Sequence, residues 1–261
     1  MAHVAAQILL PYKILGWTPG DLGSALRAWY KADILTGSNG DPQGAWSDSS
    51  GNGFDLSQTG TTRPTLAAAD LNSLNTLRFT ASSAQRFTTP RTILSAGSAG
   101  SAYMIQKVIS AAVNNGNMSW GTSGSDNHWP FSDGNLYIDF GSTVRKSCGA
   151  PTGALTSYRI FSLYSAANDW ALYVDGGTGG SGGGTSPLFS TGTNTVSWSG
   201  SNPHIGANNS LVGLDGWISE VLFTNAKQTT GDRQKVEGYL AWKWGLTGNL
   251  SASHPYKSVA P

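Results

Sequence analysis

The stretch that decides the fold is Gly213–Leu246, GLDGWISEVLFTNAKQTTGDRQKVEGYLAWKWGL. Its first part, residues 217–223, alternates with a period of two, which is typical of a β-strand. One face of this strand would carry Trp217, Ser219, Val221 and Phe223, and the other face Ile218, Glu220 and Leu222.

A helix is expected to follow the polar turn 225–228. The hydroxyl of Thr229 can cap the free N–H groups at its start, and Asp232 lies three residues later, at a capping-box position. Gly245 or Gly248 can end the helix. The apolar residues that recur at helical spacing are Val236, Tyr239, Leu240 and Trp244.

Two blocks of this sequence resemble a known family. The first is Val-Glu-Gly-Tyr-Leu-Ala-Trp-Lys-Trp-Gly-Leu at 236–246, and the second comprises Leu-Arg-Ala-Trp-Tyr-Lys-Ala-Asp at 26–33 with Trp-Ser-Asp-Ser-Ser-Gly-Asn-Gly at 46–53. Both are similar to LamG-like domains of the concanavalin A-like lectin/glucanase superfamily. The resemblance spans residues 17–257 and implies an all-β fold, a concanavalin A-like β-sandwich (jelly roll) with one short C-terminal helix.

Length and composition agree with one β domain over 17–261, preceded by an N-terminal arm over 1–16. The chain has 261 residues, 34 of them glycine, and only 12% are charged, about half the usual share. The net charge of +1 gives no electrostatic reason to expect binding to nucleic acid or to an anionic membrane. Met1–Leu15 is broken by Pro11 and lacks a basic leading region, so we expect neither a signal peptide nor a membrane span.

Short apolar runs between Gly-, Ser- and Asn-rich segments predict the remaining strands. The segment 157–174 is expected to form a hairpin that turns at 166–169, and Gly176–Gly184 reads as a flexible turn, not a phosphate loop. The predicted strands are Leu26–Lys31, Phe54–Gln58, Thr76–Phe79, Arg86–Thr89, Ala102–Val113, Asn117–Trp120, Leu136–Phe140, Ser157–Tyr164, Trp170–Val174, Val196–Trp198 and His204–Gly206.

Glycosidase chemistry needs two carboxylates that flank the scissile bond. The chain has only two glutamates, Glu220 in the predicted strand and Glu237 in the predicted helix. It lacks the Glu-x-Asp-x-x-Glu strand of the glucanases in this superfamily. We therefore expect no enzyme, and we interpret Glu220 as a structural hydrogen-bond acceptor.

Oxygen ligands at alternate positions of 48–53 imitate the first half of a calcium loop, although the twelfth position is Thr59 and not glutamate. Asp48, Asn52 and Asp215 are the nearest equivalents of the calcium ligands that some family members use. The alternative is that Asp48 and Asn52 bond to the backbone of their own turn. No cofactor is expected beyond this calcium, and the four histidines show no zinc-ligand spacing.

A sugar site combines an aromatic face with a few polar groups. The loop around Trp120 and Trp129 offers that mixture, whereas most other tryptophans, among them Trp29, Trp170, Trp217 and Trp244, are expected in the core. The single cysteine, Cys148, excludes an intrachain disulfide and is interpreted as a half-buried thiol. The candidate glycan-binding residues are Trp120, Asp126, Asn127, His128 and Trp129, with Asn208 and Asn209 as a second group.

The C-terminal pattern resembles proteins of bacteriophages and environmental bacteria. The expected function is that of a non-catalytic virion structural protein, a capsid decoration or tail-associated protein, whose lectin-like domain binds glycans. Its arm would contact other copies or other virion proteins, and its location would be the virion. The alternatives are a free-standing bacterial lectin, extracellular or on the cell surface, and a glycoside hydrolase.

Overall fold

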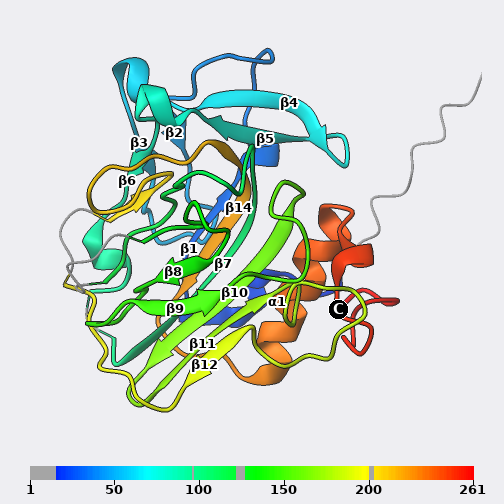
Figure 1. Cartoon of the computed structure of the whole chain (residues 1–261). Helices are drawn as coiled ribbons and strands as arrows, with labels where there is room; N and C mark the ends of the chain where they lie inside the picture. Colours follow the sequence, from blue (N-terminus) through cyan, green and yellow to red (C-terminus); the bar gives the residue numbers. More distant parts are fainter. Residues whose placement is uncertain (1–15, 96, 122–126, 200–202) are drawn as a thin grey trace, which may run out of the picture.

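The computed structural model describes residues 16–95, 97–121, 127–199 and 203–261. One large antiparallel sheet forms the centre, with helix α1 (Thr230–Lys243) and the C-terminal segment on one face and short strands and loops on the other (Figure 1). In spatial order its strands are β12 (Phe189–Thr191), β11 (Asp169–Val174), β10 (Arg159–Ala166), β7 (Ala99–Val108), β14 (Gly216–Thr224), β5 (Leu74–Phe79) and β4 (Thr65–Leu71), and β1 (Leu26–Lys31) also pairs with β14.

The second layer consists of three short antiparallel pairs and the loops around them. The pairs are β2 (Ala45–Trp46) with β3 (Leu56–Ser57), β6 (Phe87–Thr88) with β13 (His204–Ile205), and β8 (Leu136–Ile138) with β9 (Lys146–Gly149). Single 3₁₀ turns cover Ala32–Ile34, Gly60–Thr62, Ala81–Ser83, Arg91–Ile93 and Thr247–Asn249, and a longer 3₁₀ segment with a kink at Gly23 covers Pro19–Ala25. The prediction of an all-β sandwich with one C-terminal helix is confirmed. The arm predicted over 1–16 lies, except for Gly16, outside the described residues.

Strand β14 is the centre of the sheet, because it pairs with β7 along one side and with both β5 and β1 along the other. Its pairing with β7 shifts register between Ile218 and Glu220, which marks a β-bulge. The bulge changes which face of the sheet each side chain points to. Ile218 therefore packs with Val221 in the core between the two layers, and Trp217 packs with Leu222 in the core between the sheet and α1. The simple alternation predicted for residues 217–223 is therefore wrong at Trp217 and Ile218.

Helix α1 begins as the sequence predicts. The hydroxyl of Thr229 accepts a hydrogen bond from the backbone N–H of Asp232 at 3.1 Å and donates one to its carboxylate at 2.8 Å. The helix ends at Lys243, before Gly245 with φ of 70°. Its apolar side packs in a core with strand residues on the outer face of the large sheet, and the predicted residues there are Val236, Tyr239, Leu240 and Trp244.

The predicted hairpin is confirmed as β10–β11, with Ala166 paired to Asp169 and Asn168 left-handed (φ 55°). The long apolar run 102–113 forms β7 but stops at Val108 and starts at Ala99. Two predicted strands form only single bridges. The predicted strand Asn117–Trp120 contributes the bridge between Met118 and Ile205, and Val196–Trp198 contributes the bridge between Val196 and Ser142. Strands β4, β9 and β12 were not predicted, since their Ala, Ser, Gly and Thr residues give little apolar periodicity.

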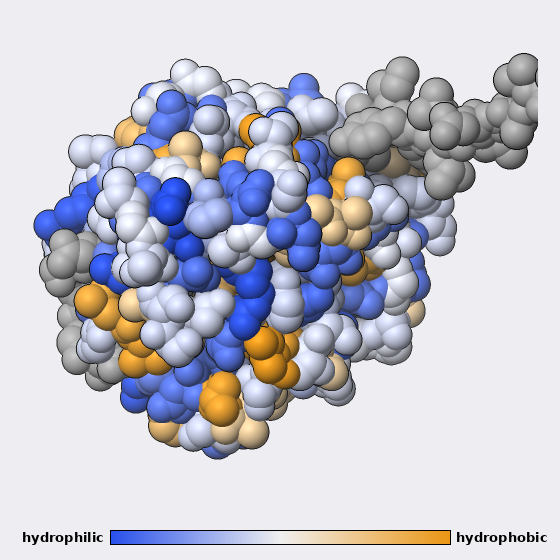
Figure 2. All heavy atoms as spheres, turned by 90° about the horizontal axis from the view of Figure 1, so that it is seen from above, coloured by the Kyte–Doolittle hydropathy of each residue, from blue (hydrophilic) through white to orange (hydrophobic). Residues whose placement is uncertain are grey.

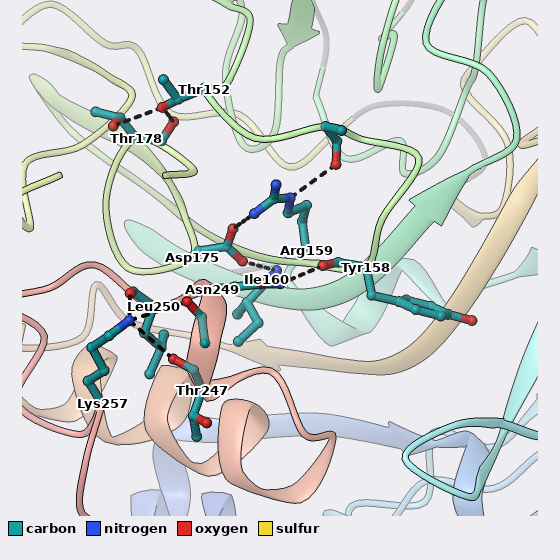
Figure 3. Close-up of polar contacts among 12 residues, drawn as sticks. Thr152, Tyr158, Arg159, Ile160, Asp175, Thr178, Thr247, Asn249, Leu250 and Lys257 are labelled. Carbon is teal, nitrogen blue, oxygen red and sulfur yellow. Dashed lines mark hydrogen bonds and ion pairs between the residues drawn. The ribbon is translucent and has the colours of Figure 1, made fainter. Parts of the chain in front are cut away.

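The C-terminal segment is held against the sheet by polar contacts (Figure 3). The side-chain amide of Asn249 donates to the Tyr158 carbonyl at 2.9 Å, and the Lys257 ammonium binds the carbonyls that end the last 3₁₀ turn. On the face shown in Figure 2, hydrophobic side chains form small separate patches among hydrophilic ones. Among the described helices, none is long and apolar enough to cross a membrane.

Candidate functional site

The two tryptophans expected to stack on a sugar are buried. Trp120 and Trp129 are each 1% exposed. The Trp120 ring packs on Phe223 of β14 at 4.6 Å between ring centroids, and the Trp129 ring packs on Phe161 of β10 at 5.4 Å. Both belong to the core between the two layers, so the exposure predicted for them is wrong.

The polar partners predicted around them do come together, but beneath the surface. The backbone N–H of Asp139 donates to the Asn127 side-chain oxygen at 2.6 Å, and the Asn208 amide donates to the Asn127 carbonyl at 3.0 Å. Asn127 and Asn208 are fully buried. These contacts tie loops of the second layer to one another instead of forming an open cleft.

The remaining glycan candidates divide between the interior and the edge of that network. His128 is 6% exposed, and its ring packs on Phe131 at 4.8 Å between centroids. Asn209 is half-buried. Asp126 lies outside the described residues.

The three predicted calcium ligands are not brought together. Oδ1 of Asp48 accepts the backbone N–H groups of Trp29 and Ser50 at 2.9 and 2.8 Å, which is the turn-stabilising role weighed as the alternative. Asn52 donates to the Leu26 carbonyl at 2.9 Å. Asp215 pairs with Arg78 near the other end of β14, about 20 Å from Asp48 by strand length. Within the described ranges, no three His, Cys, Asp or Glu side chains are grouped to hold a metal ion.

Both glutamates are buried, Glu220 between the sheet and α1 and Glu237 between α1 and the C-terminal segment. Glu220 accepts the indole N–H groups of Trp29 and Trp244 at 2.5 and 2.7 Å and pairs with Lys243 at 2.8 Å. The structural role predicted for Glu220 is thereby confirmed. Glu237 pairs with Arg233 at 2.6 Å.

A pocket of about 390 Å³ opens beside β12, at the end of the large sheet. We call it the edge pocket. It is made by the loop that enters β9, the β10–β11 turn and the segment that follows β12. Its lining residues are Val144, Lys146, Asn168, Phe189, Thr191, Thr193, Asn194 and Thr195.

Asn194 is the fixed polar group of the edge pocket. It is 6% exposed, and its Nδ2 donates to the Ser165 hydroxyl and to the Ala166 carbonyl, both at 2.9 Å. These two acceptors fix the amide orientation, because a carbonyl oxygen can only accept. The Asn194 Oδ1 is buried and has no hydrogen-bond partner among the described residues. A buried acceptor without a partner is costly, so a ligand donor that reached this atom would gain a hydrogen bond that the protein does not supply. The oxygen itself has almost no surface open to solvent in this structure.

Hydroxyls and apolar groups complete the pocket. The Thr191 and Thr193 hydroxyls lie 3.0 Å apart, and one bonds the other. Phe189 is half-buried with its ring edge-on to Trp170 at 6.0 Å, and Val144 is 60% exposed. None of the eight lining residues is acidic. This arrangement can hold a polyhydroxylated ligand by hydrogen bonds and an apolar wall, with no carboxylate pair for hydrolysis.

Sequence reasoning missed the edge pocket, because its three segments lie far apart along the chain. The run Thr-Gly-Thr-Asn-Thr at 191–195 is the one available signal, since it concentrates hydrogen-bonding side chains beside Phe189. A second cleft of about 240 Å³ lies beside Arg27, whose guanidinium already donates to the Ile93 carbonyl at 3.3 Å. No buried polar atom of its lining residues lacks a partner, so the edge pocket is the stronger candidate.

No protein-family model matches this chain, and no curated protein sequence matches it. Solved structures share its fold. An arabinofuranosidase complexed with arabinofuranosyl-alpha-1,2-xylobiose has a TM-score of 0.56 at 12% identity, over 84% of this chain and 63% of that chain. Domain 4 of AbnA, a GH43 extracellular arabinanase from Geobacillus stearothermophilus, in complex with arabinotriose, has a TM-score of 0.54 at 15% identity, over 81% of this chain and 98% of that domain.

The binding domain of Paraclostridial Mosquitocidal Protein 1 has a TM-score of 0.53 at 12% identity, over 82% of this chain. The chain matches only about half of that domain, 52%. Identities this low establish a common β-sandwich fold, and function must be argued from the site. The more specific resemblance to LamG-like domains of phage proteins stays a prediction.

Proposed function

We propose that this protein is a non-catalytic carbohydrate-binding β-sandwich domain whose ligand occupies the edge pocket. The observation that carries the proposal is the buried, unpartnered Oδ1 of Asn194 in a pocket lined by threonine hydroxyls. After a small shift of the pocket wall, a sugar hydroxyl would reach and donate to this oxygen, which has almost no accessible surface here, while the ring's C–H face lies against Phe189 and Val144. The pocket volume of about 390 Å³ lies within the range of small-ligand sites.

The fold supports this proposal. Domain 4 of the arabinanase AbnA, which shares the sandwich over nearly its whole length, was solved in complex with arabinotriose. Since the two chains are only 15% identical, the likeness suggests a class of ligand and not a particular sugar. The edge pocket of this chain must therefore be tested with a broad set of glycans.

The test is a glycan array followed by calorimetric titration of each bound sugar. We expect Asn194→Ala to abolish binding and Thr193→Ala, at an exposed position, to weaken it several-fold. Thr152→Ala is the matched control, since Thr152 is also exposed, bonds Thr178 (Figure 3) and does not line the edge pocket. Failure to bind any glycan, or equal weakening by Thr152→Ala, would contradict the proposal.

A glycoside hydrolase is the second candidate, favoured by the fold shared with an arabinofuranosidase over 84% of this chain. Both glutamates are buried in ion pairs, so the exposed carboxylates are the ones to test. The exposed aspartates among the described residues are Asp21, Asp41, Asp55, Asp70 and Asp133. Release of reducing sugar from arabinan or xylan, lost in an Asp-to-Asn variant, would support this candidate. Intact polysaccharide after prolonged incubation supports binding alone.

We further propose that the domain is displayed on a virus particle, as its C-terminal pattern suggests. Residues 1–15, the expected attachment arm, lie outside the described residues. Light scattering of the full-length chain and of a chain without residues 1–15 tests assembly through this arm. An oligomer that becomes monomeric on truncation supports the proposal, whereas a monomer in both forms favours a free-standing lectin.

A further inference from the structure

Lys146 is an unusual residue in the wall of the edge pocket. It is the first residue of β9, where its side chain points inward together with that of Cys148, and it is only 7% exposed. Its ammonium donates one hydrogen bond, to the Ser142 hydroxyl at 3.1 Å. Among the described residues, this ammonium has no other hydrogen-bond or ion-pair partner.

Ser142 cannot neutralise this charge. Its hydroxyl already donates to the Val144 carbonyl at 3.0 Å and accepts the Val144 N–H at 3.1 Å as well as the Lys146 ammonium. An ammonium group carries three donors, so two of them are unused. Burying a cation is expensive, and burial lowers the pKa of Lys146 for this reason. The negative charge of the buried Asp139 opposes this shift, but it makes no ion pair with the ammonium and offsets only part of the burial cost.

The other buried lysine and the buried arginine each form an ion pair with a carboxylate. Lys243 pairs with Asp33 and Glu220, each at 2.8 Å, and Arg233 pairs with Glu237 at 2.6 Å. Among the described residues, Lys146 is thus the one buried lysine or arginine without a carboxylate within ion-pair distance. It is also the one that lines a pocket open to solvent.

We infer that the edge pocket selects sugars that carry an acidic group, whose carboxylate or sulfate oxygen pairs with the ammonium of Lys146. Asn194 accepts a hydrogen bond from a hydroxyl of the same ring. One side of the pocket therefore recognises a negative charge and the other recognises a hydrogen-bond donor. The inference rests on the proposed function. A charge-assisted hydrogen bond at a buried ammonium is stronger than a neutral one, which gives an acidic sugar its advantage over the neutral sugar of the same shape.

The experiment compares oligogalacturonate with its methyl ester, because esterification removes the charge and keeps the ring. Calorimetric titration of the full chain is expected to give an affinity at least about tenfold higher for the free acid. Sulfated and unsulfated galactan oligomers form a second pair, which separates carboxylate from sulfate as the preferred anion. Binding of either acidic member over its neutral counterpart supports the inference.

Two variants locate the preference. Lys146→Met keeps the length of the side chain and should make the acidic and neutral members of each pair bind equally, whereas Lys146→Arg should retain the preference. Lys235→Met is the control, since Lys235 is a half-buried lysine on α1 that does not line the edge pocket. The wild-type comparison needs no variant, so it stands even where Lys146→Met fails to fold.

The outcomes separate this inference from the proposed function. Equal affinity for acidic and neutral members overturns the selectivity and leaves carbohydrate binding intact. An acidic preference that survives Lys146→Met also overturns it, because another group then supplies the charge. Absence of binding to every glycan overturns both.

Discussion

Trp244 at the end of helix α1 donates its indole N–H to Oε2 of Glu220, a residue of the central strand β14, at 2.7 Å. The carboxylate of Glu220 is fully buried, and it also accepts the indole N–H of Trp29 from β1 and pairs with Lys243. One side chain therefore joins the helix, the central strand and the first strand. It turns the strand-and-helix stretch of the sequence into one packed unit.

We predict that Glu220→Gln destabilises the fold by about 3–5 kcal/mol, because it leaves the buried ammonium of Lys243 with less compensation and places an amide donor among three donors. Urea unfolding followed by tryptophan fluorescence measures this loss. Lys235→Ala removes a partly exposed ion pair with Asp232 and should change the stability by less than about 1 kcal/mol. Equal stability of Glu220→Gln and the wild type would contradict the structural role.

Asp175 predicts a dependence of stability on pH. Burial raises its pKa to about 6, although Arg159 at 2.7 Å and the N–H of Ile160 at 2.9 Å favour the charged form (Figure 3). Between about pH 4 and 6 the folded state then holds a proton that the unfolded state has released, so stability falls as pH rises. The loss amounts to about 1.4 kcal/mol per pH unit across that window.

The comparison of the wild type with Asp175→Asn isolates this effect, because asparagine keeps an oxygen for the N–H of Ile160. Urea unfolding at pH 4 and at pH 6.5 should show the wild type losing more stability than the variant as pH rises. Parallel stability curves for the two proteins would show that the pKa of Asp175 is not raised.

His204 predicts the opposite slope in the same window. It is 4% exposed, and burial together with the charge of Arg86 lowers its pKa to about 4. Below about pH 6.5 the unfolded state takes up a proton that the folded state does not, so stability falls as pH falls. Urea unfolding of His204→Gln should show less loss than the wild type between pH 6.5 and pH 4.5, and an identical loss would refute the prediction.

Cys148 should be unreactive in the folded protein. The thiol is 5% exposed and burial raises its pKa, so the reactive thiolate is suppressed. A chromogenic disulfide reagent is expected to label none of the native protein in the time that it labels one equivalent in urea. Rapid native labelling of this single cysteine would contradict the burial of β9.

The residues that the sequence places well are those whose signal is local. The Thr229 cap, the apolar row from Val236 to Trp244 and the β10–β11 hairpin each follow from spacing within about twenty residues. The phase of β14 could not be predicted in the same way, because the bulge after Ile218 arises from pairing with β7, which lies more than a hundred residues earlier.

The candidate site depends even more on packing between residues that lie far apart in the sequence. Trp120 and Trp129 occur in a polar, glycine-containing loop that resembles a sugar site in sequence, yet Phe223 and Phe161 from two sheet strands take up their ring faces. The edge pocket, in contrast, contains Lys146 from β9, a strand whose sequence Lys-Ser-Cys-Gly shows no apolar periodicity. Nothing local distinguishes a ring or an ammonium that will be covered from one that will line a pocket.

The sequence by itself determined an all-β chain with one C-terminal helix, a structural Glu220 and no disulfide, because periodicity, capping and residue counts are properties of neighbouring residues. Only the tertiary structure decided which polar groups lack partners. Whether Asn194 and Lys146 are satisfied depends on the loop before β9, the β10–β11 turn and the segment after β12, which meet only when the two layers pack. Burial and hydrogen-bond satisfaction are relations between distant segments, and the binding site is made of them.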